Sequence, residues 1–282
     1  MVEGVPDKDQ IIPVDASVHF LDCNEAWALL TEKEQLYAYH FTQASWEGAK
    51  ICTFQRSYES PALVILLRAI FAEGHKSLKD KAIAQGVSEE EWKQLVVYAA
   101  ATLQNLGNYK SFGDKKFIPE LSAEKFWTVV KLSEIYKKYK TEIDDIWKAI
   151  GEIVYKIGVP FNVLGFSDQN AVTTYYSAKI TKAEATKLKE FQEEMKISPL
   201  NTRLIKLNES TYWLRLASAE KGNLPYIKTH EWKDLKVVVE NGEFAYIMKK
   251  VIYHLEECLK YVDNEHKKEM LQEYIEHFKY GE

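Results

Sequence analysis

The chain has 282 residues, of which 46% are hydrophobic and 28% are charged, and its formal net charge is -5 at pH 7. This length and composition are typical of a folded globular protein with one large domain or two ordinary ones, and they exclude a disordered or fibrous chain. Lys and Glu are interleaved along helical segments such as 187–190, so the sequence offers no basic patch and disfavours nucleic-acid binding.

The sequence also disfavours a membrane protein. It contains no apolar run of about 18 residues, which a membrane-spanning helix would require, and no signal-peptide pattern at its N-terminus. We therefore expect a cytoplasmic protein without a membrane partner. Cys23, Cys52 and Cys258 are odd in number and widely spaced, so we interpret them as free thiols.

Helices are predicted where a side-chain oxygen can accept a hydrogen bond from a free backbone N–H at a helix start. Three Ser/Thr–Glu pairs have the spacing of a capping box, and acidic residues after Thr141 mark a fourth start. The pairs are Thr31 with Glu34, Ser88 with Glu91, and Thr181 with Glu184. Apolar residues recur at steps of three and four in 92–106, 143–157, 244–259 and 271–278, which predicts helices with one buried face.

The pattern changes to period two between Thr202 and Leu216, which predicts a hairpin around the polar connection 208–210. Further extended segments are predicted at 172–177 and at 235–239, with the second ending at Asn241-Gly242, and 220–234 is expected to be irregular. Together these patterns predict an α+β fold, mostly helical with a small antiparallel β-core, and residues 1–282 as a single compact unit.

No segment has the spacing of a zinc-hydrolase motif, in which two histidines flank a turn of helix as in HExxH. His230-Glu231 has no second histidine one turn later, and the nucleophile-elbow and phosphate-loop patterns are absent. His40 lies in an aromatic helical stretch and is interpreted as a structural histidine rather than a base. A later group is interpreted as surface residues of amphipathic helices. This group comprises His254, Glu257, Glu265, His266, Glu276 and His277.

The segment 105–114 follows a predicted helix and places aromatic residues among small polar ones. One interpretation is a helix end capped at Gly107 followed by a turn, since Gly, Asn and Asp are ordinary turn formers. The other interpretation is a functional loop. The residue types alone leave both open.

Residues 105–117 closely resemble a signature of the dipeptidyl peptidase III family. Other segments resemble that family in the same order along the chain, from about Val14 to the last helix. They are 21–26, 36–40, 97–100, 173–177, 201–204 and 214–218. The resemblance implies two-lobed cytosolic zinc peptidases that release dipeptides from the N-terminus of short peptides, with zinc held by a HExxxH helix and a downstream Glu.

By this resemblance, Ser111 and Phe112 correspond to substrate-binding residues that line the peptide cleft, where the peptide pairs as an added strand. The chain stops at Glu282, before the family's HExxxH region. We therefore expect an incomplete N-terminal, peptide-binding lower lobe that lacks the zinc-binding lobe, with no catalytic or metal residue and no cofactor in this chain, although the full-length family uses zinc.

Such a chain is expected to be inactive alone and to bind short peptides. Its protein partner would be the missing catalytic lobe or a second copy of itself, because an incomplete lobe can expose an unpaired strand edge or an apolar patch. The alternative is a stand-alone, non-catalytic relative that binds peptides or a protein.

Overall fold

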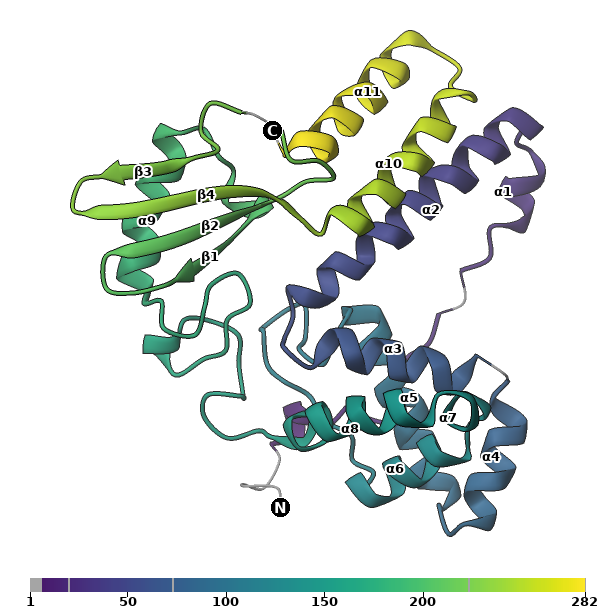
Figure 1. The fold of residues 1–282 in the computed structure, drawn as a ribbon. Helices are drawn as coiled ribbons and strands as arrows, with labels where there is room; N and C mark the ends of the chain where they lie inside the picture. The colour runs from purple at the N-terminus through teal and green to yellow at the C-terminus, as the bar shows by residue number, and fades with distance from the viewer. Residues whose placement is uncertain (1–6, 20, 73, 223, 282) are drawn as a thin grey trace. The chain divides into compact units, whose positions relative to one another are not determined.

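The computed structural model describes residues 7–19, 21–72, 74–222 and 224–281, and the chain forms two compact units (Figure 1). The first unit comprises Met1–Val18 and Thr53–Thr173, and the second comprises His19–Cys52 and Thr174–Glu282. Helix α2, Glu32–Phe54, crosses this boundary near its C-terminal end. The single-unit expectation for 1–282 stays a prediction, because two compact units can still unfold in one cooperative transition.

The first unit is helical. Its elements are η1 (Lys8–Gln10), α3 (Ser60–Phe71), α4 (His75–Ala84), α5 (Glu89–Asn105), α6 (Ala123–Leu132), α7 (Glu134–Lys138), α8 (Lys140–Tyr155) and η2 (Ser167–Gln169). Leu67, Leu95, Phe126 and Val154 are fully buried in its core and come from four different helices. The predicted apolar faces of α5 and α8 therefore pack into one core.

The predicted helix starts are confirmed with one displacement. Ser88 Oγ accepts a hydrogen bond from the Glu91 N–H at 3.2 Å, and the Glu91 carboxylate accepts one from the Ser88 N–H at 2.8 Å. The same reciprocal bonds join Thr31 to Glu34. The cap predicted at Thr141 lies two residues earlier, at Tyr139. The Tyr139 N–H donates to the Ile135 carbonyl of α7, and the Tyr139 carbonyl accepts from the Ile143 N–H of α8.

The second unit contains a four-stranded sheet of order β1-β2-β4-β3. Its strands are β1 (Thr202–Lys206), β2 (Thr211–Ala217), β3 (Thr229–Trp232) and β4 (Leu235–Glu243). The predicted α+β class and the β1–β2 hairpin are confirmed. The sheet is mixed rather than wholly antiparallel, because the β3–β4 hairpin places β4 parallel to β2.

Three extended segments differ from the sequence predictions. β4 continues through Asn241-Gly242, where the sequence predicted a strand end. Gly242 adopts φ +96°, and the register with β2 shifts between Leu216 and Ala217, so Asn241 and Gly242 form a bulge. The segment expected to be irregular, 220–234, contains β3. Residues 172–177 form only isolated bridges, from Val172 to Leu164 and from Tyr176 to Leu204.

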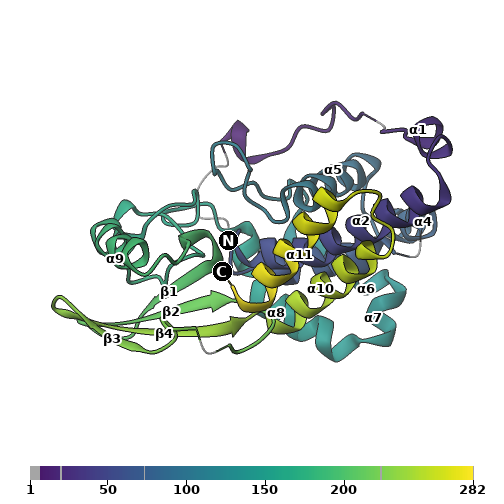
Figure 2. The same cartoon turned by 90° about the horizontal axis from the view of Figure 1, so that it is seen from above.

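Helix α9 (Lys182–Glu194) covers one face of this sheet, as both views show (Figures 1 and 2). Leu204, Leu214, Val237 and Val239 are buried and alternate with more exposed residues along their strands. This alternation is the period-two pattern that a half-covered sheet requires.

The rest of the second unit is helical. It contains α1 (Asn24–Ala28), most of α2, η3 (Pro199–Asn201), α10 (Ala245–Leu259) and α11 (Glu265–Tyr280). Buried residues of α2, α10 and α11 share one apolar cluster, which includes Ala44, Val251 and Leu271. Cys23, Cys52 and Cys258 are free thiols, as predicted. Within the described residues, none of the helices combines the length and apolar character that crossing a membrane requires.

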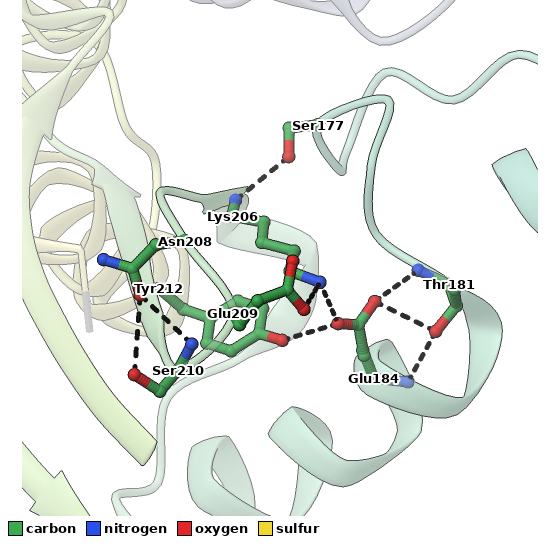
Figure 3. A network of polar contacts seen from close by, with 8 residues as sticks. All are labelled: Ser177, Thr181, Glu184, Lys206, Asn208, Glu209, Ser210 and Tyr212. Carbon is green, nitrogen blue, oxygen red and sulfur yellow. Dashed lines mark hydrogen bonds and ion pairs between the residues drawn. The ribbon is translucent and has the colours of Figure 1, made fainter.

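A polar network joins the start of α9 to the β1–β2 hairpin (Figure 3). Glu184 accepts hydrogen bonds from the Thr181 N–H at 2.8 Å, from Lys206 Nζ at 2.7 Å and from the Tyr212 hydroxyl at 2.7 Å. Burial raises the pKa of Glu184, but these hydrogen bonds outweigh burial and lower its pKa to about 2. Burial, and then the hydrogen bond to Glu184, raise the pKa of Tyr212 to about 12.

We expect Glu184→Gln to lower the free energy of unfolding at pH 7 by about 1–2 kcal/mol, because it removes charged hydrogen bonds from a side chain that is 24% exposed. The depressed pKa means that the wild-type contribution is complete above about pH 4.5 and is lost as the pH falls towards 2. Urea unfolding at pH 7, 5 and 3 should therefore show the difference between wild type and variant shrinking with acidity.

The matched control is Glu190→Gln, which removes another α9 carboxylate paired with a lysine, but on a side chain that is 55% exposed. We expect this control to change stability little at any of the three pH values. Equal effects of the two substitutions would contradict the role assigned to the Glu184 network.

Candidate functional site

The loop after α5 is shaped by a close backbone approach. Leu106 ends the helix in the left-handed conformation with φ 54°, one position before the predicted cap. At Gly107 a Cβ atom would lie 2.2 Å from Ser60 Oγ and 2.8 Å from Arg56 Cβ. Glycine is therefore required at 107 because the loop backbone packs directly against Arg56 and the first residue of α3.

A buried polar cluster lies beneath this loop. The Asn108 side chain accepts hydrogen bonds from the hydroxyls of Ser57 at 3.1 Å and Ser60 at 3.3 Å, and its amide donates to Glu59 at 2.9 Å. All four residues are buried. The Asn108 carbonyl accepts a hydrogen bond from the Phe117 N–H at 2.9 Å, so the cluster also fixes the returning strand of the loop.

An ion pair completes the base of the loop. Lys116 Nζ lies 2.6 Å from the Glu59 carboxylate, and the two side chains are 0% and 2% exposed. Lys116 also donates to the Ile153 carbonyl at 2.6 Å and lies over the rings of Tyr109 and Phe161. Burial lowers the pKa of Lys116, and the Glu59 carboxylate opposes this effect. The cation is thus held by a carboxylate, a carbonyl and two aromatic faces.

The tip of the loop carries the two predicted substrate-binding residues side by side. Phe112 is 94% exposed. The Ser111 N–H donates to Asn105 Oδ1 at 2.8 Å, and Arg56 Nη2 donates to Ser111 Oγ at 2.9 Å. The positive φ angles at 113–114 then turn the chain back. The tip therefore presents an exposed aromatic ring, a hydroxyl and a guanidinium on a backbone with a fixed base.

Sequence reasoning predicted Ser111 and Phe112 as substrate-binding residues, and this stays a prediction. It did not connect them with Arg56, Asn108 or the Glu59–Lys116 pair. No local pattern connects 56–60 with 108–116, because their contacts span about fifty positions along the chain. The one available signal was the position of Glu59 and Ser60 at the start of an apolar helix, which equally fits an ordinary helix start. Among the described residues, no ion pair links Arg56 to a carboxylate.

The zinc implied by the resemblance does not fit the described residues. Within 7–19, 21–72, 74–222 and 224–281, no group of three or more His, Cys, Asp and Glu side chains is placed to hold a metal ion. A zinc hydrolase needs three protein ligands and an open position. His230 instead makes a 2.9 Å hydrogen bond to the Tyr226 carbonyl. We therefore derive no step through zinc from these residues.

A cavity of about 1470 Å³ also lies in the first unit. Its lining includes Ile11, Val14, Glu120, Trp147 and Tyr155. Ser111 and Phe112 are not among its lining residues. The cavity is large enough for a ligand.

The comparisons with known proteins all point to one family. The sequence model of Peptidase family M49 matches residues 146–282. The chain is 39% identical to dipeptidyl peptidase 3 of Nematostella vectensis over 100% of the chain and 41% of that relative. It is 36% identical to dipeptidyl peptidase 3 of Homo sapiens, over 98% of the chain and 39% of the relative. It is 37% identical to dipeptidyl peptidase 3 of Dictyostelium discoideum, over 97% of the chain and 38% of the relative.

The chain thus spans about two fifths of the length of the curated relatives that it matches. The similarity to these relatives extends over nearly the whole chain, and therefore over both compact units.

The buried pair under the loop generates a stability prediction. Glu59→Gln should lower the free energy of unfolding by about 3–5 kcal/mol, because it leaves the Lys116 cation buried without a carboxylate. The measurement is urea unfolding at neutral pH followed by circular dichroism. Lys115→Met is the control, since this neighbouring lysine pairs with Asp9 while its side chain is 47% exposed.

We expect the Lys115 variant to change stability little, because exposed ion pairs contribute little. A Glu59 variant as stable as the wild type would mean that the loop base does not depend on the ion pair.

Proposed function

Because the chain belongs to the dipeptidyl peptidase 3 family, we propose that it supplies a peptide-binding lobe of a peptidase that releases dipeptides from short peptides. The peptide contacts are assigned to the tip of the loop at Ser111 and Phe112. One observation carries this assignment: Phe112 is 94% exposed at the tip of a loop whose base is held by a buried polar cluster.

The Phe112 ring supports peptide binding on energetic grounds. Covering a phenylalanine side chain contributes roughly 1.5–3 kcal/mol relative to leaving it in water. The exposed ring makes no comparable contribution to folding, since it lies outside the core of its unit. Because the loop base is fixed by Asn108 and Lys116, little backbone entropy is lost when a ligand covers the ring.

The polar groups of the tip complement a peptide backbone. Ser111 Oγ accepts a hydrogen bond from Arg56, which leaves the Ser111 hydroxyl hydrogen available for a peptide carbonyl. Arg56 has further N–H donors of its own. An aromatic ring for an apolar side chain beside donors for the peptide backbone is the combination that a tolerant peptide subsite requires.

Catalysis by these 282 residues alone is not part of the proposal. The sequence contains no pair of histidines at the spacing of a zinc-peptidase helix, and the described residues contain no three-ligand cluster. The zinc-dependent cleavage step is therefore assigned to residues of the family that lie outside this sequence. The alternative, a non-catalytic peptide- or protein-binding relative, rests on the same loop.

Phe112→Ala is expected to weaken peptide binding by about 5- to 150-fold, which corresponds to about 1–3 kcal/mol for a ring that is covered in the complex. The measurement is calorimetric titration of the 282-residue chain with tetra- to octapeptides. Because the ring is exposed, the melting temperature should stay unchanged.

Tyr139→Ala is the matched control, since Tyr139 is another exposed aromatic residue of the first unit, at the junction of α7 and α8. Its removal should leave peptide affinity unchanged. If the Phe112 variant and the wild type bound peptides with equal affinity, the loop would be interpreted as an ordinary helix end and turn.

The purified chain should release no dipeptide from an N-terminally free hexapeptide, with or without added zinc. Liquid chromatography of the products provides the measurement. A second assay adds to the chain the part of a full-length relative that the chain does not match, produced as a separate protein. This assay distinguishes the peptidase lobe from the non-catalytic relative. Restored cleavage supports the peptidase lobe, and peptide binding without restored cleavage supports the non-catalytic relative. Zinc-stimulated dipeptide release by the chain alone would overturn the assignment of catalysis to residues elsewhere.

A further inference from the structure

Two histidines face each other across a helix pair in the second unit. His40 lies on α2 and His254 lies on α10, and their Nδ1 atoms are 3.3 Å apart. These two helices run alongside one another (Figure 1), and their buried residues share one apolar cluster. The two residues are 214 positions apart in the sequence, so only the fold brings them together.

Aromatic neighbours hold both imidazole rings in place. The Tyr261 ring stacks on His40 with centroids 5.9 Å apart and an interplanar angle of 7°. Tyr39 meets His40 edge-on and Tyr253 meets His254 edge-on, each at 5.1 Å. Both histidines are half-buried, so their rings are oriented by packing while solvent still reaches them.

Charged side chains lie near His254. Burial lowers the pKa of His254, the neighbouring His40 lowers it further, and the carboxylates of Glu47 and Glu257 oppose both effects. Each of these carboxylates is itself paired with a lysine, Lys50 at 2.6 Å and Lys260 at 2.5 Å. A metal ion binds the neutral form of imidazole.

The separation of the two nitrogens fits a metal ion. Two nitrogen ligands at 2.0–2.1 Å from one metal ion lie about 2.9 Å apart in a square-planar complex and about 3.3 Å apart in a tetrahedral one. We propose that His40 and His254 bind one divalent first-row transition metal ion, Cu²⁺, Ni²⁺ or Zn²⁺, through their Nδ1 atoms, with water completing the coordination.

The proton balance is simple. Without metal, one ring can carry its proton on Nδ1 and share it with the other Nδ1, whereas in the complex both rings carry their protons on Nε2. Two neutral rings therefore bind the ion by a change of tautomer without net proton release. Protonation of either ring competes with the metal, so the affinity falls as the medium becomes acidic.

This site differs in chemistry from the zinc site of a peptidase. Among the described residues only two protein ligands converge, and no third His, Cys, Asp or Glu joins them. The ion would therefore connect α2 to α10 and have no role in hydrolysis. Affinity should follow the usual order for imidazole ligands, with Cu²⁺ bound more tightly than Ni²⁺ or Zn²⁺.

The test is titration of the metal-free 282-residue chain, without an affinity tag, with CuCl₂ and NiCl₂. Calorimetry should detect one site per chain, and electron paramagnetic resonance of the Cu²⁺ complex should show coupling to imidazole nitrogens. A metal that binds only the folded chain should also raise the melting temperature by a few degrees at saturation. His40→Gln and His254→Gln should each lower the affinity at least tenfold.

His266→Gln is the matched control, because His266 lies on α11 with its side chain 99% exposed. This variant should bind Cu²⁺ and Ni²⁺ as the wild type does. Circular dichroism of both His→Gln variants of the pair tests that they remain folded. Metal affinities that are unchanged in two folded variants, or that fall equally in the His266 variant, would overturn the proposal and leave the pair as an ordinary hydrogen bond.

Discussion

The Glu59–Lys116 ion pair is the contact on which the candidate site depends. A lysine with no exposed side-chain surface requires a partner for its charge, and Glu59 provides it at 2.6 Å. Both members of the pair also make hydrogen bonds to other elements of the first unit. Its carboxylate also accepts from Asn108, and its ammonium donates to the end of α8 at Ile153. One buried charge pair thus joins the start of α3, the loop after α5 and the last turn of α8.

The consequence is a loop with a fixed base and an exposed tip. Asn108 and Lys116 lie on either side of the tip, so the backbone between them is closed by two buried anchors. Gly107 allows the first anchor to approach Ser60 closely, which no residue with a Cβ could do in this conformation. Polar groups buried beneath the loop hold its shape, and an apolar group exposed at its tip is left for a ligand.

The sequence predicted those parts of the fold that depend on short-range hydrogen bonds. The capping boxes at Ser88 and Thr181 and the hairpin of β1 and β2 need only residues within a few positions, and all three were found. β3 and the parallel pairing of β2 with β4 were missed, since a four-residue edge strand has no clear period and strand order depends on distant contacts.

The sequence also did not reveal the long-range contacts that hold the candidate loop. Ser111 and Phe112 were predicted from a family resemblance, whereas the residues that anchor their loop lie about fifty positions away and belong to no motif.

The two proposed sites are built from different residues, and each set of residues lies within one compact unit. The loop depends on the buried polar cluster and helical core of the first unit, and the His40–His254 pair depends on the apolar cluster shared by α2, α10 and α11. Sites without shared partners contribute additively to binding and stability. Peptide affinity and metal affinity should therefore respond to separate substitutions.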